Sequence, residues 1–190
     1  MTISKNGIEL TSLDAWEKHA GPKSPKHWVD GRSAKEVARA WLEGKSVDLP
    51  EEVASALANH EAFGAVQAWQ AEPEAKLRFD NFPGEPRNSD LVVYAQDSNG
   101  PYLIAVEAKA DEPYGQPVAK TLAAAVSRYE KNNRSNGVKR IEQLVVALFG
   151  TSITGDPLIG GVRYQLLTAC AGALCEAERH GYSRTLMLIH

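Results

Sequence analysis

Three residues that could do metal-dependent chemistry lie within one short stretch of the chain. Sixteen residues separate Asp90 from Glu107, and Lys109 follows Glu107 by two positions. Carboxylates are the ligands that a hard divalent cation prefers, and an amine beside them can stabilise developing negative charge. Two carboxylates held together without a cation repel each other, which raises one pKa. The set is useful only if the fold brings the three side chains together.

The residues around this set predict a β-hairpin. Residues 91–95 and 102–106 are rich in Val, Ile and Tyr, which favour strands. Between them, residues 97–100 read Asp-Ser-Asn-Gly, and Asn and Gly accept the positive φ that tight hairpin turns require. The three candidate residues therefore fall at the end of the hairpin opposite the turn.

The register of this hairpin decides which residues are paired, and two registers fit the sequence. A turn centred on Ser98-Asn99 places Asp90 opposite Glu107, whereas a turn centred on Asn99-Gly100 places Asp90 opposite Lys109. Side chains alternate along a strand, so both registers gather the two acids and the lysine on one face. A slip of one residue would separate them.

This arrangement resembles the PD-(D/E)XK nuclease superfamily, whose motif lies on such a hairpin. Ser89 stands where that motif has proline, and the flanking text F-P-G-E-P-R-N-S-D and E-A-K-A-D-E-P-Y-G is similar to a small, uncharacterised bacterial branch of the superfamily. The resemblance implies that Asp90, Glu107 and the backbone carbonyl of Ala108 hold Mg²⁺ or Mn²⁺. It also implies that Lys109 assists catalysis.

Two further polar residues are candidates on the same resemblance. Many members of the superfamily carry an additional acid on the helix before the sheet, and Glu61 lies on that predicted element. Gln165 opens the predicted helix 162–179, where relatives sometimes place a polar residue facing the metal; an exposed helix start explains it equally well. The acids that compete with Glu61, each also explained as a solvated helix charge, are Glu51, Glu52, Glu72 and Glu74.

A basic cluster stands out in a chain whose net charge is −3. Residues 120–140 hold six Lys or Arg and the single acid Glu130. Two interpretations are open: a patch that contacts nucleic-acid phosphates, or a solvated helix end whose basic residues complement the helix dipole. The residues of the first interpretation are Arg128, Lys131, Arg134, Lys139 and Arg140.

Hydrophobic periodicity and turn signals predict an α/β fold. The expected order is α-β-β-β-α-β-α-β, a mixed β-sheet flanked by helices, and the resemblance makes it restriction-endonuclease-like. The continuous apolar run in residues 144–149 predicts a central strand covered on both faces. The predicted elements are an irregular polar arm 1–32, a helix from Ser33 ending at Gly44, a helical region from Pro50 through Trp69, strand 75–82, the hairpin, helix 116–131, strand 141–149, helix 162–179 and strand 185–189.

Length and composition set the broad class. We expect an N-terminal arm and docking helix over 1–49 and a nuclease-like domain over 50–190, whose end one residue after the last strand is compatible with truncation. No leader-like or membrane-spanning apolar run occurs, which favours a cytoplasmic protein. Cys170 and Cys175 are too far apart for a CxxC pair and are expected to be reduced thiols of the core.

The leading hypothesis is a divalent-metal-dependent nuclease, a hydrolase of phosphodiester bonds. Its partner would be nucleic acid, with DNA favoured over RNA, and a homodimer is one open option. The alternative is a nuclease-fold module that binds nucleic acid or a protein without cutting. In that case Asp90, Glu107 and Lys109 form an ordinary cross-strand ion-pair set.

Overall fold

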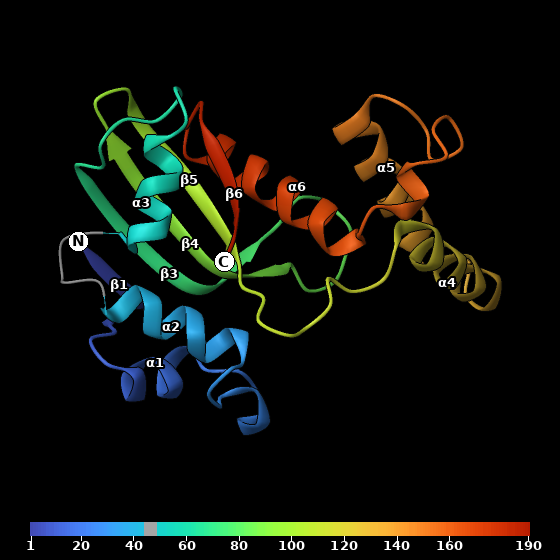
Figure 1. Ribbon diagram of the computed structural model, residues 1–190. Coiled ribbons are helices and arrows are strands. Elements are labelled where there is room, and N and C mark those ends of the chain that lie inside the picture. The colour runs from blue at the N-terminus through green and yellow to red at the C-terminus, as the bar shows by residue number, and fades with distance from the viewer. Residues whose placement is uncertain (44–48) are drawn as a thin grey trace.

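The protein is built around one mixed β-sheet with helices on both of its faces (Figure 1). The computed structural model describes residues 1–43 and 49–190. The six strands lie in the order β2-β1-β3-β4-β5-β6, and this confirms the expected α/β class with a mixed sheet. The strands are β1 (Thr2–Lys5), β2 (Ile8–Glu9), β3 (Ala68–Leu77), β4 (Arg87–Asp97), β5 (Gly100–Glu107) and β6 (Thr185–Ile189).

The helices divide into three groups, each with its own apolar cluster. Helices α1, α2 and α3 cover one face of the sheet, and α6 covers the other. Helices α4 and α5 pack on each other and on the start of α6, beyond the edge of the sheet (Figure 1). Their bounds are α1 (Leu13–Ala20), α2 (Ser33–Glu43), α3 (Glu51–Ala58), α4 (Val118–Lys131), α5 (Gly137–Phe149) and α6 (Tyr164–Arg179), with short 3₁₀ turns at Pro25–His27 and Ile159–Gly161.

The central hairpin adopts the first of the two predicted registers. Leu91 pairs with Val106 and Asp97 pairs with Gly100, so the turn is Ser98-Asn99. Continuing this register by one residue sets Asp90 opposite Glu107. β6 then lies parallel to β5, and the long connection through α4, α5 and α6 gives the chain the length that a parallel crossover needs.

The predicted central strand at 141–149 is wrong, because this segment is helix α5. Its buried residues Ile141, Leu144 and Val145 follow helical spacing, and Ile141 and Val145 pack against Val118 of α4 and its neighbours. Taken alone, the Leu-Val-Val run resembles a buried strand. Together with the residues on either side of it, the apolar positions have helical spacing. Gly150, left-handed with φ of 68°, ends the helix in the usual way.

The helical region predicted from Pro50 is also shorter than expected. α3 begins after Pro50 as predicted but ends at Ala58, and Trp69 lies in β3 instead. Buried and exposed residues alternate from Ala68 to Leu77, the period of a strand. The first strand of the meander is therefore 68–77 rather than 75–82, because the alternation already begins at Trp69.

The N-terminal arm is not irregular, which corrects the prediction for residues 1–32. β1 and β2 form a small hairpin around Asn6-Gly7, both in the left-handed region, and β1 pairs with β3 in parallel. The Asn-Gly pair is a strong hairpin signal that could have found this turn. Helix α2 begins at Ser33 as predicted; Gly44, its expected end, lies outside the described residues.

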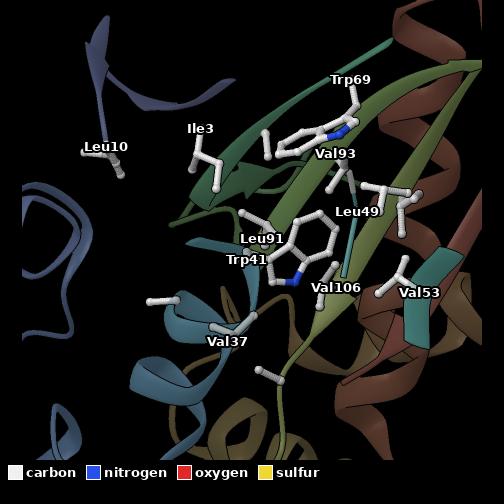
Figure 2. Close-up of a cluster of buried hydrophobic side chains, with 14 of the residues drawn as sticks. Ile3, Leu10, Val37, Trp41, Leu49, Val53, Trp69, Leu91, Val93 and Val106 are labelled. Carbon is white, nitrogen blue, oxygen red and sulfur yellow. The ribbon is translucent and has the colours of Figure 1, made fainter. Parts of the chain in front are cut away.

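The largest apolar cluster joins the arm to the sheet (Figure 2). Trp41 of α2 packs edge-on against Trp69 of β3, with ring centroids 5.9 Å apart and planes at 82°. Trp16 and Trp28 are buried in the same cluster. Large aromatic side chains bury much apolar area, so these contacts hold α1 and α2 firmly on the sheet.

The opposite face of the sheet is covered at close range by α6. The position of a Cβ built on Gly172 would lie 3.1 Å from the Cβ of Leu77, so only a residue without a side chain fits without displacement. Cys170 and Cys175 of this helix are free and partly buried, and burial raises the pKa of both thiols. Within residues 1–43 and 49–190, no helix is long and apolar enough to cross a membrane.

A buried ion pair closes the turn end of the hairpin. The Asp97 carboxylate accepts hydrogen bonds from both terminal nitrogens of Arg184, at 2.9 and 2.7 Å, and from the backbone N–H groups of Gly64 and Asn99. The Arg184 guanidinium also stacks over the ring of Tyr102, 5.1 Å from its centroid. This pair fixes the start of β6 to the hairpin.

Candidate active site

The two predicted acids meet where the hairpin strands begin to diverge, at the end of β4 and β5 nearest α6. The regular ladder stops at Leu91 and Val106, one residue before the acids. From there the Asp90 side chain takes over the pairing, because its Oδ2 accepts a hydrogen bond of 2.7 Å from the backbone N–H of Ala108. The structure thus brings Asp90, Glu107 and Ala108 together, as the sequence predicted.

Glu107 is buried, with only 2% of its surface exposed, and its carboxylate is bound on both oxygens. Lys109 Nζ lies 2.9 Å from Oε1, and the Gln165 side chain donates to the same oxygen. Arg87 donates to Oε2. The sequence favoured Asp80 and Glu85 as partners of Arg87 and did not predict its contact with Glu107, although Arg87 lies on the same strand as Asp90. Gln165 faces the site, which favours the first of its two interpretations.

Asp90 is held in a different electrostatic environment. Burial raises its pKa, and the nearby charge of Glu107 raises it further, to about 6, against the opposing effects of the Ala108 N–H and of Lys109. Glu107 has three cationic or polar side-chain donors, whereas Asp90 has one backbone donor. The buried negative charge of this pair is therefore compensated unequally, with Asp90 less well compensated.

The third acid near the pair is Glu74 and not Glu61. Glu74 lies opposite Asp90, since the β3–β4 register is the same on either side of it, and it adopts a φ of 50° that is uncommon for a residue with a side chain. Burial is the largest cause of its raised pKa, and the charge of Glu107 contributes. Asn88 binds its carboxylate at 3.1 Å.

Glu61 is exposed in a turn after α3, so its predicted place on a helix facing the metal is wrong. The carbonyl of the next residue, Ala62, binds Arg184, which in turn binds Asp97 at the other end of the hairpin. Asp97 and Asp90 are seven positions apart along the strand, a length of about 23 Å. Sequence order alone could not show that α3 ends before this acid.

The oxygens that could hold a metal here are of the kind that Mg²⁺ or Mn²⁺ prefers. They are the carboxylate oxygens of Asp90 and Glu107 and the backbone carbonyl of Ala108. Among the described residues, no three His, Cys, Asp or Glu side chains lie close enough to hold one ion. Mg²⁺ is commonly bound by only one or two carboxylates, completed by waters and substrate phosphates, so two acids suffice.

We expect Asp90→Asn to stabilise the protein at neutral pH. The Asp90 pKa rises from 3.8 to about 6 on folding, so the ionised form is disfavoured in the native state. Stability from this source is highest below about pH 4 and is lost as the pH rises through 6, by on the order of 3 kcal/mol. Asparagine keeps the acceptor for the Ala108 N–H and removes the charge.

Urea denaturation of both proteins between about pH 4 and pH 8 measures this effect. As the pH rises, the free energy of unfolding of the variant should increase relative to that of the wild type. In acid the difference should vanish. Adding Mg²⁺ should stabilise the wild type alone. A variant that is less stable than the wild type at pH 8 would contradict the assignment of Asp90 as a poorly compensated acid.

The basic cluster lies at one end of the α4–α5 pair. Arg128 and Lys131 are in the last turns of α4, Arg134 is in the connection, and Lys139 and Arg140 are in the first turn of α5. The first four are exposed. Arg140 is partly buried and binds Asp80 with its Nε at 2.6 Å from Oδ2, so one member of the predicted patch is already paired.

Comparison with known proteins identifies the family but no function. The chain is an α/β protein with a six-stranded mixed sheet. It belongs to the family described as a domain of unknown function, DUF6946, which matches residues 9–190 and thus includes most of the N-terminal arm. No curated protein and no solved structure matches the chain.

Proposed function

We propose that this protein is a divalent-metal-dependent nuclease of the PD-(D/E)XK type. The observation that supports the proposal is that Asp90 and Glu107 lie directly opposite each other on two neighbouring strands, and that Lys109 forms an ion pair with Glu107. The order of elements adds support: from α3 the chain runs helix, three antiparallel strands, helices and a last strand parallel to the third. This retains the expected order apart from α5, which replaces a strand.

The chain's own residues would divide the work as follows. Asp90, Glu107 and the Ala108 carbonyl would hold the ion, which supplies positive charge and lowers the pKa of a bound water. Lys109 would orient the attacking water or neutralise charge that develops on the phosphate. Arg87 and Gln165 would fix the orientation of the Glu107 carboxylate, because each donates to one of its two oxygens.

One observation favours the alternative, a module that binds without cutting. Glu107 already has donors on both oxygens, and its interactions with Arg87 and Lys109 form a buried ion-pair set that needs no metal. Oε1 already accepts from Lys109 and Gln165, whereas Oε2 accepts from Arg87 and keeps a lone pair that an ion could use. The nuclease proposal therefore requires that the ion bind through Oε2, or that Lys109 turn from Oε1 toward the substrate.

Calorimetric titration with Mg²⁺ and Mn²⁺ separates the two functions, followed by cleavage assays on single- and double-stranded DNA and RNA. Binding in the millimolar range or tighter, with cleavage that chelation stops, supports the nuclease. The absence of metal binding, both alone and with bound nucleic acid, would favour the non-catalytic module. DNA substrates are expected to be cut better than RNA.

The basic patch provides a prediction for nucleic-acid binding. Reversing Lys131 and Lys139 to Glu should weaken binding to all sequences by at least tenfold and flatten its dependence on salt, because contacts with phosphates release counterions. Anisotropy titrations over a range of salt concentrations measure both effects. Reversing Lys18 and Lys26 of the N-terminal segment is the matched control. If the two double variants have equal effects, the basic residues are ordinary solvated surface charges and not a nucleic-acid-binding patch.

A further inference from the structure

A pocket beside the acid pair is lined by three arginines. It has a volume of about 170 Å³ and lies between the segment after β3, the start of β4 and the first turns of α5 and α6. Arg78, Arg87 and Arg140 all line it, as does the ring of Tyr164. Arg87 also binds Glu107, so the pocket and the proposed active site share a side chain.

The arginines are held in place by acceptors that leave part of each guanidinium free. Arg78 donates to the backbone carbonyls of Phe82 and Gly84 and, within residues 1–43 and 49–190, forms no ion pair with an acid. Arg140 uses Nε and one terminal nitrogen on Asp80, and its other terminal nitrogen has no partner among the described residues. Fixed guanidiniums of this kind are well suited to bind a tetrahedral oxyanion.

Acids in the pocket cancel only part of this charge. Asp80 is paired with Arg140 and Glu85 with Lys76 at 2.7 Å, so among the described residues neither acid is paired with Arg78. Within the described part of the chain, the Tyr164 hydroxyl has no hydrogen-bond partner and remains a free donor. Burial raises its pKa, as does the charge of Asp80, while the charges of Arg140 and Arg128 oppose the rise.

We propose that this pocket binds a phosphate group of the nucleic-acid substrate, next to the phosphate that is hydrolysed. That the ligand belongs to a nucleic acid rests on the proposed function. That a phosphate binds here rests on the pocket itself. Arg140 lines the pocket and also belongs to the basic patch, so a strand lying along the patch would reach the acid pair through the pocket. The phosphate could be terminal or internal, and the two sources share one chemistry.

The first experiment measures inorganic phosphate binding by calorimetry in EDTA, where neither metal nor cleavage contributes. Arg140→Gln should weaken binding at least tenfold, and Tyr164→Phe about threefold to tenfold, from the loss of one charged and one neutral hydrogen bond. Arg39→Gln is the matched control, because Arg39 also pairs with an acid, Asp30, but lies on α2. Tyr164→Phe keeps the test valid if Arg140→Gln does not fold.

The second experiment identifies the source with one oligonucleotide carrying a 5′-phosphate, a 3′-phosphate or neither. Tighter binding of one phosphorylated form, lost in Tyr164→Phe, assigns a terminal phosphate; equal weakening of all three forms assigns an internal one. Absence of phosphate binding, or equal weakening by Arg39→Gln, would overturn the pocket. Phosphate binding without cleavage would support the phosphate pocket and reject the nuclease function. Cleavage without phosphate binding would support the nuclease function and reject the phosphate pocket.

Discussion

Glu107→Gln is expected to abolish metal binding and reduce cleavage by at least about 100-fold, because the bound ion supplies several kcal/mol of charge stabilisation. The change preserves the size of the side chain and one acceptor oxygen, so the fold should survive. Calorimetry with Mn²⁺ and a cleavage assay under identical conditions measure both losses. Glu142→Gln, on the exposed side of α5, is the matched control and should change neither quantity.

Lys109 gives the contrasting result at the same site. Lys109→Met should keep metal binding and lose most of the rate, because the ammonium acts on charge that develops during the reaction. Glu107→Ala, in contrast, should also lower the free energy of unfolding, since it leaves Arg87 and Lys109 without their buried acid. Undiminished cleavage in Glu107→Gln would exclude this acid from the chemistry.

Asp97→Ala is expected to produce the largest loss of stability, about 3–5 kcal/mol. The Asp97 side chain is fully buried, and its removal leaves the Arg184 guanidinium, which is 16% exposed, without its acid. It also removes the acceptor for the N–H groups of Gly64 and Asn99. Denaturant unfolding measures the effect, with Asp111→Ala as control, because Asp111 forms an exposed pair with Arg32.

The pH dependence of this loss follows from the Asp97 pKa. Hydrogen bonds from Arg184, the largest cause, hold the pKa well below its usual range. Stability from a carboxyl with a lowered pKa is present above its unfolded pKa and is lost only as the pH falls through the folded value. The difference between wild type and Asp97→Ala should therefore be constant at neutral pH and shrink only in strong acid. A difference below 1 kcal/mol at neutral pH would contradict a structural role for the pair.

The two ends of the hairpin therefore have different roles. At the turn end, Asp97 is fully compensated by Arg184 and stabilises the fold. At the open end, Asp90 retains a raised pKa of about 6 beside the buried Glu107. Poorly compensated charge in a folded protein is costly, so its presence is a reason to look for a ligand there. The expected opposite signs of Asp90→Asn and Asp97→Ala test this distinction directly.

Local sequence was sufficient to predict the hairpin and its acids. The turn at Ser98-Asn99 and the β-branched strands depend on neighbouring residues, and strand alternation then fixes which side chains share a face. For the same reason the start of α2 at Ser33, the start of α3 after Pro50 and the last strand β6 were predicted correctly. Each is determined by residues a few positions apart.

Tertiary structure alone decided the features that depend on distant residues. The apolar residues within 141–149 fit a buried strand as well as a helix. The segment is a helix because Ile141 and Val145 pack against residues of α4. Arg87 and Gln165 reach Glu107 from 20 and 58 residues away, and Glu74 comes to lie opposite Asp90 only through the register of β3. Such contacts follow from how elements pack, which local periodicity does not encode.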